Sequence, residues 1–342
     1  ATYSLFPGLW MDFHHLDGWH ASHTRCFCGF RCATLYHKNL SGSGAGEPDV
    51  MFFIRLSETM LKISRDTVLT LTTFFALVIV FYVLGYWLIY RMGQATPLML
   101  SVGAATLATC IIRKRSLASL GWHWGDWKHQ WLSYLIPFSI ALTAYLIIWF
   151  IGFGEFYNAE FLLKQKENYN LSDWNDVSIF AFHFILVASI SFLISLPSVL
   201  GEELGWRGLL VPELSKFLSF TSIALVSGLV WSVWHWPLII MGLYGNDITP
   251  LYYQLFFFTM FIVSSSIIMT YLRLKTGSLW TAVIYHMSSN IFIQKIFTPI
   301  TVTKTDSSWY IDEFGAITAL VAFGVAVFFW RKGAAEFGVV RT

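Results

Sequence analysis

The sequence has little charge. Asp, Glu, Lys and Arg together make up 12% of its 342 residues, against roughly a quarter in an ordinary soluble domain. So few charged side chains cannot cover the surface of a soluble protein of this length, whereas a surface that faces lipid needs almost none. The net charge of +2 is small, and no basic block alternates with stacking aromatic residues. We therefore expect no nucleic-acid partner.

Several catalytic motifs are absent. The sequence has no His-Glu-x-x-His segment, which argues against a zincin metalloprotease, and no Gly-x-Ser-x-Gly segment, which argues against a hydrolase nucleophile elbow. Every aspartate lies outside the apolar runs, so a pair of intramembrane aspartates is unavailable. Cysteine is scarce, and Cys26, Cys28 and Cys32 have a spacing that matches no closed zinc module, although histidines lie nearby.

Apolar residues dominate what is present, at 56% of the chain with a mean hydropathy of +0.59. A helix needs about 20 predominantly apolar residues to cross the hydrocarbon core of a bilayer. We therefore predict an all-α fold, a polytopic membrane bundle of about eight transmembrane helices in contact with membrane lipid. The predicted spans are residues 67–90, 93–112, 131–153, 177–200, 220–241, 251–272, 278–296 and 314–330.

The first 60 residues differ from the rest of the chain in their apolar pattern. Residues 1–60 show no apolar periodicity and include the linker-like stretch 41–46, followed by Met51, which resembles a natural start. We expect 1–60 to be a disordered or non-native extension and 61–335 to be the membrane-embedded domain. Lys and Arg gather in alternate loops, which predicts cytoplasmic termini. No signal peptide with a small-residue cleavage site is evident, which predicts that the first span is retained as an anchor. Short loops favour a prokaryotic cell membrane, and residues 120–127 are typical of an amphipathic interfacial segment.

Three groups of polar residues interrupt the predicted spans. An ionisable residue at membrane depth is expensive to bury and is therefore a functional hypothesis. Glu203 and Arg207 are four residues apart and can pair on one helix face, which leaves Glu202 as a plausible general base. Alone, this group is equally typical of an ordinary ion pair at a helix end.

The other two groups contain histidine. His235 lies among tryptophans in the fifth span, where a single histidine is more often a packing residue than a catalyst. His286 and Asn290 share a face of the seventh span, where polar side chains also serve to hold helices together. Considered together, the three groups present side chains suited to proton transfer or metal binding from three separate spans.

This combination resembles the CPBP family, also called the Abi or CAAX protease-like family of intramembrane endopeptidases. The family signature is Glu-Glu-x-x-x-Arg, then aromatic-x-x-x-His, then His-x-x-x-Asn or Asp. Residues 175–295 contain all three elements in order, with Trp231 as the aromatic residue where the family usually has Phe. The resemblance implies a cavity open to the cytosol and a peptide or protein substrate that is lipidated or otherwise associated with the membrane.

The implied reaction is hydrolysis of a peptide bond. Glu202 and His235 would activate a water molecule, His286 and Asn290 would stabilise the oxyanion, and Glu203, Arg207 and Trp231 would support them. A second version has a zinc ion held by Glu202, His235 and His286, so the cofactor is either none or zinc. Two other functions fit the same residues: a non-catalytic bacteriocin-immunity or scaffold protein of the same fold, and a small ion-coupled transporter.

Overall fold

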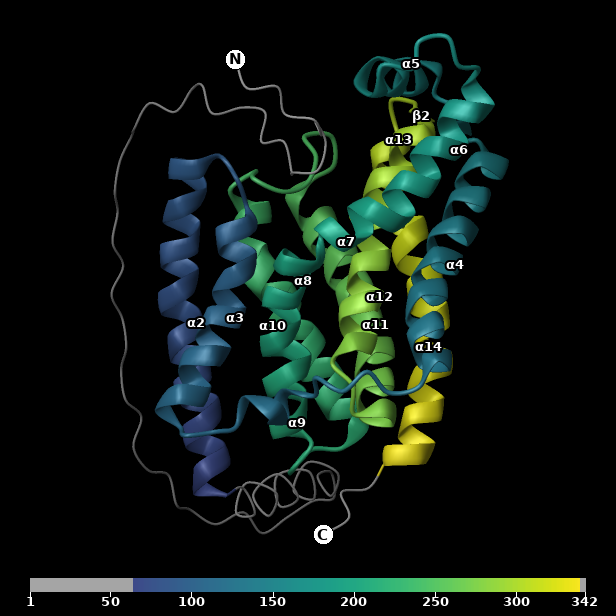
Figure 1. Cartoon of the computed structure of the whole chain (residues 1–342). Helices are drawn as coiled ribbons and strands as arrows, with labels where there is room; N and C mark the ends of the chain where they lie inside the picture. The colour runs from purple at the N-terminus through teal and green to yellow at the C-terminus, as the bar shows by residue number, and fades with distance from the viewer. Residues whose placement is uncertain (1–63, 339–342) are drawn as a thin grey trace, which may run out of the picture. The chain divides into compact units, whose positions relative to one another are not determined.

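The computed structural model describes residues 64–338. The expectation for residues 1–60, and the Cys26, Cys28 and Cys32 cluster, lie outside these residues. Within them the fold is an all-α bundle, as predicted from the apolar runs (Figure 1). Its helices are α2 (Arg65–Met92), α3 (Thr96–Ile112), α4 (Trp127–Ile151), α5 (Ala159–Tyr169), α6 (Asp176–Leu186), α7 (Phe192–Ile194), α8 (Leu196–Glu203), α9 (Val211–Leu214), α10 (Phe220–Ile240), α11 (Leu251–Thr276), α12 (Trp280–Asn290), α13 (Thr298–Ile300) and α14 (Ala316–Phe337).

The membrane-crossing character of the bundle comes from its longest helices. Among residues 64–338, six helical stretches are long and apolar enough to span a bilayer: Arg65–Met92, Trp127–Ile151, Asp176–Ile194, Phe220–Ile240, Leu251–Thr276 and Ala316–Phe337. Helix α3 is apolar but shorter. The predicted seventh span is formed by α12 and most of a π-helical segment (Ile291–Phe297), and α13 follows beyond it. The protein is therefore an integral membrane protein of helical bundle type, and the count of eight spans stays a prediction.

The helical structure that contains the predicted fourth span extends beyond the apolar run. Helical structure continues past Leu200 through α8, the π-helical segment Leu204–Leu210 and α9. Glu202 therefore lies inside a buried helical run, and not just past the end of a helix as the predicted span 177–200 implied. The apolar pattern stops at Glu202, but Glu203 and Arg207 pair with each other, which allows both charges to be buried. The α-helix is interrupted at Ser195, two residues before Pro197, whereas α10 continues through Pro237.

Glycines bring α8 into close contact with α3. A Cβ atom on Gly103 would lie 2.8 Å from the carbonyl oxygen of Gly201, and one on Gly201 would lie 3.0 Å from the carbonyl oxygen of Met99. Small residues permit such close backbone approach between membrane helices. This contact fixes the position of Glu202, the residue after Gly201, relative to the neighbouring helix.

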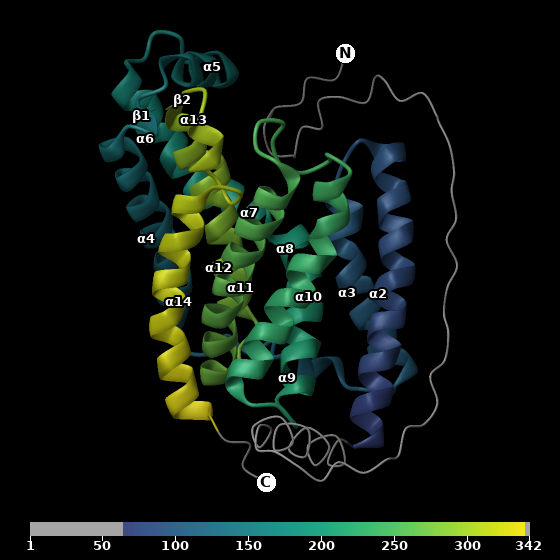
Figure 2. The ribbon, with the colours of Figure 1, turned by 180° about the vertical axis from the view of Figure 1, so that it is seen from behind.

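The upper end of the bundle in Figure 1 carries structure that the sequence did not predict. Strands β1 (Gly154–Phe156) and β2 (Thr301–Thr303) pair antiparallel, and α5 lies beside them. At the opposite end, α2 begins and α14 ends, as both views show (Figure 2). The segment at 120–127 lies at that lower end and exposes Trp122, Trp124 and Trp127, as expected of an interfacial segment.

Candidate active site

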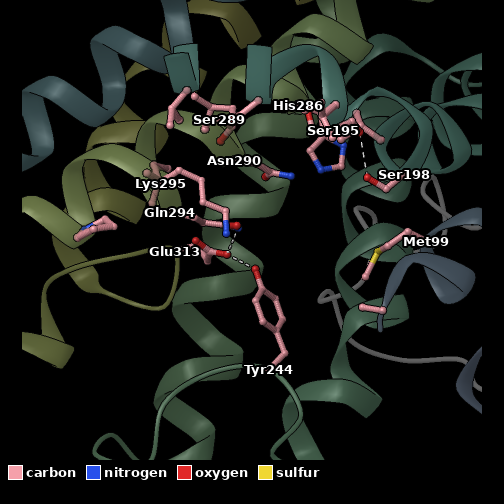
Figure 3. A pocket seen from close by; sticks show the side chains of 18 of the residues that line it. Met99, Ser195, Ser198, Tyr244, His286, Ser289, Asn290, Gln294, Lys295 and Glu313 are labelled. Atoms are coloured by element: carbon pink, nitrogen blue, oxygen red, sulfur yellow. Dashed lines mark hydrogen bonds between the residues drawn. The ribbon is translucent and has the colours of Figure 1, made fainter. Parts of the chain in front are cut away.

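Each of the three polar groups contributes at least one side chain to the wall of one cavity. Its volume is about 390 Å³, and its wall includes Glu202 from α8, His235 from α10, and His286 and Asn290 from α12. Figure 3 shows His286 and Asn290 on the cavity wall, with Ser195 and Ser198 close to His286. Residues separated by more than eighty positions in the sequence therefore meet at one site. Much of the remaining wall is apolar and includes Met99, Phe258, Phe261 and Ile262.

The Glu202 carboxylate is held by a neutral donor. Trp231 Nε1 donates a hydrogen bond to Glu202 Oε2 over 2.9 Å, and both side chains are 3% exposed. A carboxylate held by a neutral indole keeps more of its basicity than one paired with a cation. The sequence assigned Trp231 only a supporting role as an aromatic residue. The structure adds this hydrogen bond, which phenylalanine at the same position could not make.

Glu203 points away from the cavity wall and connects two helices. Its carboxylate accepts hydrogen bonds from Arg207 Nη1, at 3.0 and 3.1 Å, and from His286 Nδ1 at 2.9 Å. Glu203 and Arg207 are both fully buried, and the guanidinium carbon of Arg207 lies 4.3 Å from the ring centroid of Trp231. One carboxylate thus neutralises a buried arginine and orients a histidine of the cavity wall.

The hydrogen bonds of the two histidines assign their protons. His235 Nδ1 lies 3.0 Å from the carbonyl oxygen of Trp231, and His286 Nδ1 faces the Glu203 carboxylate. Neither oxygen can donate, so each Nδ1 carries the proton. The Nε2 atom of neutral His235 is then a base. His286 donates its Nδ1–H to the Glu203 carboxylate, and its Nε2 can donate a further hydrogen bond when both ring nitrogens carry protons.

Comparison with known proteins gives matches in the same part of the chain. The family model for type II CAAX prenyl endopeptidase Rce1-like proteins matches residues 179–292, which contain Glu202, His235, His286 and Asn290. The CAAX prenyl protease 2 of Methanococcus maripaludis is 36% identical over 94 residues, which are 26% of this chain and 34% of that protein. Residues 179–292 therefore resemble the CAAX protease-like family, as the motifs predicted. It matches about a third of the length of this curated relative.

The zinc version of the family chemistry can be tested against the arrangement of donor atoms. Among residues 64–338, no group of three or more His, Cys, Asp or Glu side chains is placed to hold a metal ion. Glu202, His235 and His286 share the cavity, but they are not close enough together to bind one ion jointly. The three side chains do not form a metal-ligand set in this arrangement, and we derive no step through a metal.

The cavity also contains polar residues outside the family motifs. Glu313, in the loop before α14, is 3% exposed and lies beyond the residues that the family model matches. It accepts hydrogen bonds from Tyr244 and Gln294. On the cavity wall nearer α5, His183 contacts Tyr169 through Nδ1 at 2.8 Å. Glu313 lies outside every apolar run, so no signal in the sequence distinguished it from a surface residue.

Proposed function

We propose that the protein is an intramembrane endopeptidase that hydrolyses a peptide bond of a lipidated or membrane-associated peptide, with a prenylated CAAX-type peptide as the first substrate to test. The observation that carries this proposal is the convergence of Glu202, His235, His286 and Asn290 on one cavity between apolar helices. An apolar wall beside this polar group suits a substrate that has both a lipid and a peptide part.

In the proposed mechanism, Glu202 and His235 act on one water molecule. The Glu202 carboxylate accepts one proton of the water as its oxygen attacks the carbonyl carbon of the substrate, while the unprotonated Nε2 atom of His235 accepts a hydrogen bond from the other O–H. The proton on Glu202 then passes to the nitrogen of the leaving amine as the C–N bond breaks, which completes hydrolysis. Trp231 positions both groups, because its indole binds Glu202 and its backbone carbonyl binds His235.

His286 and Asn290 are the proposed oxyanion donors. With both ring nitrogens protonated, His286 would donate from Nε2, and the Asn290 amide would donate from the next turn of the same helix. Donors that are fixed before the reaction stabilise the developing charge without reorganising. Glu203 orients His286 by accepting from its Nδ1, and Arg207 in turn balances Glu203. We also propose that the end of the bundle rich in Arg and Lys faces the cytoplasm.

The test is cleavage of a farnesylated, internally quenched peptide by the purified protein in lipid nanodiscs. Glu202→Gln keeps an acceptor for the Trp231 indole but cannot take a proton, so we expect the rate to fall by about a hundredfold or more. Ser198→Ala, which alters the same cavity wall without touching Glu202, is the matched control. Equal cleavage by the Glu202→Gln variant and the unaltered protein would count against an enzyme and in favour of a scaffold or transporter.

A further inference from the structure

A second polar group lies in the same cavity, and we call it the acid cluster: Glu313, Tyr244 and Gln294. Both neighbours donate to the same oxygen of Glu313. The Tyr244 hydroxyl donates to Oε1, and Gln294 Nε2 donates to it over 2.7 Å. Figure 3 shows the Tyr244 hydroxyl and the Gln294 amide directed at Glu313. Two donors occupy both lone pairs of Oε1 and leave Oε2 as the remaining oxygen.

The acid cluster adjoins both walls that carry the motif residues. Gln294 follows Asn290 by four residues along the same helical run. The Tyr244 ring lies beside His235, with ring centroids 6.2 Å apart. A peptide bound between His235 on one side and Asn290 on the other therefore meets Glu313 next, as it continues along the cavity.

The surroundings of Glu313 favour its uncharged form. Burial and the neighbouring carboxyl group of Asp312 raise the pKa of Glu313 well above its usual range. Because Oε1 already accepts two hydrogen bonds, the acid proton lies on Oε2. Asp312 is the carboxylate that can accept this proton when no ligand is bound. An uncharged carboxylic acid has one acceptor oxygen and one donor, which is the hydrogen-bonding pattern of a primary amide.

We propose that Glu313 is a recognition residue whose Oε2–H donates a hydrogen bond to a main-chain carbonyl oxygen of the peptide substrate. The inference rests on the proposed peptidase function and adds a binding contact outside the family motifs. It specifies the ligand as an uncharged peptide group and not a basic side chain. A basic side chain would need the ionised carboxylate.

The choice of substitution separates these two ligands. In nanodiscs with the farnesylated, quenched peptide, Glu313→Gln keeps one acceptor and one donor, so KM should stay within about twofold. Glu313→Leu keeps the volume but loses both, and KM should rise about three- to tenfold, the worth of one neutral hydrogen bond, with kcat nearly unchanged. Glu336→Gln changes a distant carboxylate and serves as control. An equal loss in the Gln and Leu variants, or no loss in either, overturns the proposal.

A modified probe tests the carbonyl contact directly. Replacing one peptide bond with an ester weakens its carbonyl oxygen as an acceptor, so probes carrying the ester at successive positions locate the contact. At one position the ester should raise KM for the unaltered protein and for Glu313→Gln, but add nothing to the loss in Glu313→Leu. The Gln variant keeps this test informative if the Leu variant does not fold. If the ester acts independently of Glu313 at every position, the proposal is wrong.

Binding separates this inference from the proposed function. Fluorescence anisotropy of a labelled farnesylated peptide is measured on the full-length protein with and without Glu313→Leu. Binding that depends on Glu313 without any cleavage rejects the peptidase and keeps the recognition site. Cleavage with no effect of Glu313 rejects the recognition site alone. A peptide that is neither bound nor cleaved overturns both.

Discussion

The buried contact among Glu203, Arg207 and His286 allows stability to be separated from catalysis. Replacing Glu203 with Gln leaves Arg207 as an uncompensated charge, in a side chain with no exposed surface. Removing one partner of a buried pair costs about 3–5 kcal/mol. Arg207→Met should cost a similar amount, because it leaves the Glu203 carboxylate buried with His286 as its remaining partner. Each single variant should therefore unfold at a lower SDS fraction in a detergent titration.

The double variant Glu203→Gln/Arg207→Met removes both charges together. Replacement of a buried pair by neutral groups of similar volume is often close to neutral for stability, so we expect most of the loss to be recovered. Activity should not recover. A neutral amide can still accept the hydrogen bond from His286 Nδ1, but it supplies no negative charge beside an imidazole that donates to the oxyanion, and loss of one oxyanion donor costs about a hundredfold in kcat.

The assay therefore compares unfolding and peptide cleavage in the same four proteins. Recovery of stability without recovery of kcat supports the role of Glu203 in holding His286 as an oxyanion donor. A double variant that regains kcat to within about tenfold of the original protein would refute that reasoning. It would leave Glu203 and Arg207 as a structural pair only.

Three further predictions follow from single contacts. Trp231→Phe keeps an aromatic ring over Arg207 but removes the indole N–H that donates to Glu202. In the cleavage assay kcat/KM should therefore fall roughly tenfold, whereas unfolding in the SDS titration should change little. Unchanged cleavage would mean that this hydrogen bond is not needed. Gly103→Ala forces a Cβ atom against the Gly201 carbonyl and should cost about 1–3 kcal/mol of stability, whereas Gly324→Ala, which meets nothing within 4 Å, should be neutral or slightly stabilising. Direct water activation predicts that 1,10-phenanthroline changes kcat by less than about twofold, and a loss that added zinc restores would favour the metal version instead.

Much of the fold follows from the sequence because lipid imposes a simple rule on composition. Each predicted apolar run corresponds to helical structure in the described residues, since a backbone in hydrocarbon must satisfy its own hydrogen bonds. The rule fails where charges are compensated internally. The fourth run continues through Glu203 and Arg207, and hydropathy cannot show that two opposite charges will neutralise each other. The pairing of β1 with β2 could not be predicted either, because it joins two short segments that lie far apart in the sequence.

The candidate site was predictable in its members but not in its contacts. Helical spacing predicted the pair of Glu203 and Arg207, and the structure forms it. Spacing along one helix cannot show that His286 bonds to Glu203 and not to Glu202, because that choice depends on how two helices rotate against each other. Glu313 was missed for a related reason. Only the packed bundle brings its loop against Tyr244 and Gln294.

The fully buried arginine of the fourth helical run has a consequence for biogenesis. Alone in a bilayer, a segment carrying two glutamates and an arginine would insert at a considerable energetic penalty. In the folded protein these charges are balanced partly within the segment and partly by His286 from α12, which is synthesised later. Stable residence of this segment in lipid therefore depends on the arrival of its downstream neighbour, and a chain truncated before α12 should be retained by insertion factors or degraded.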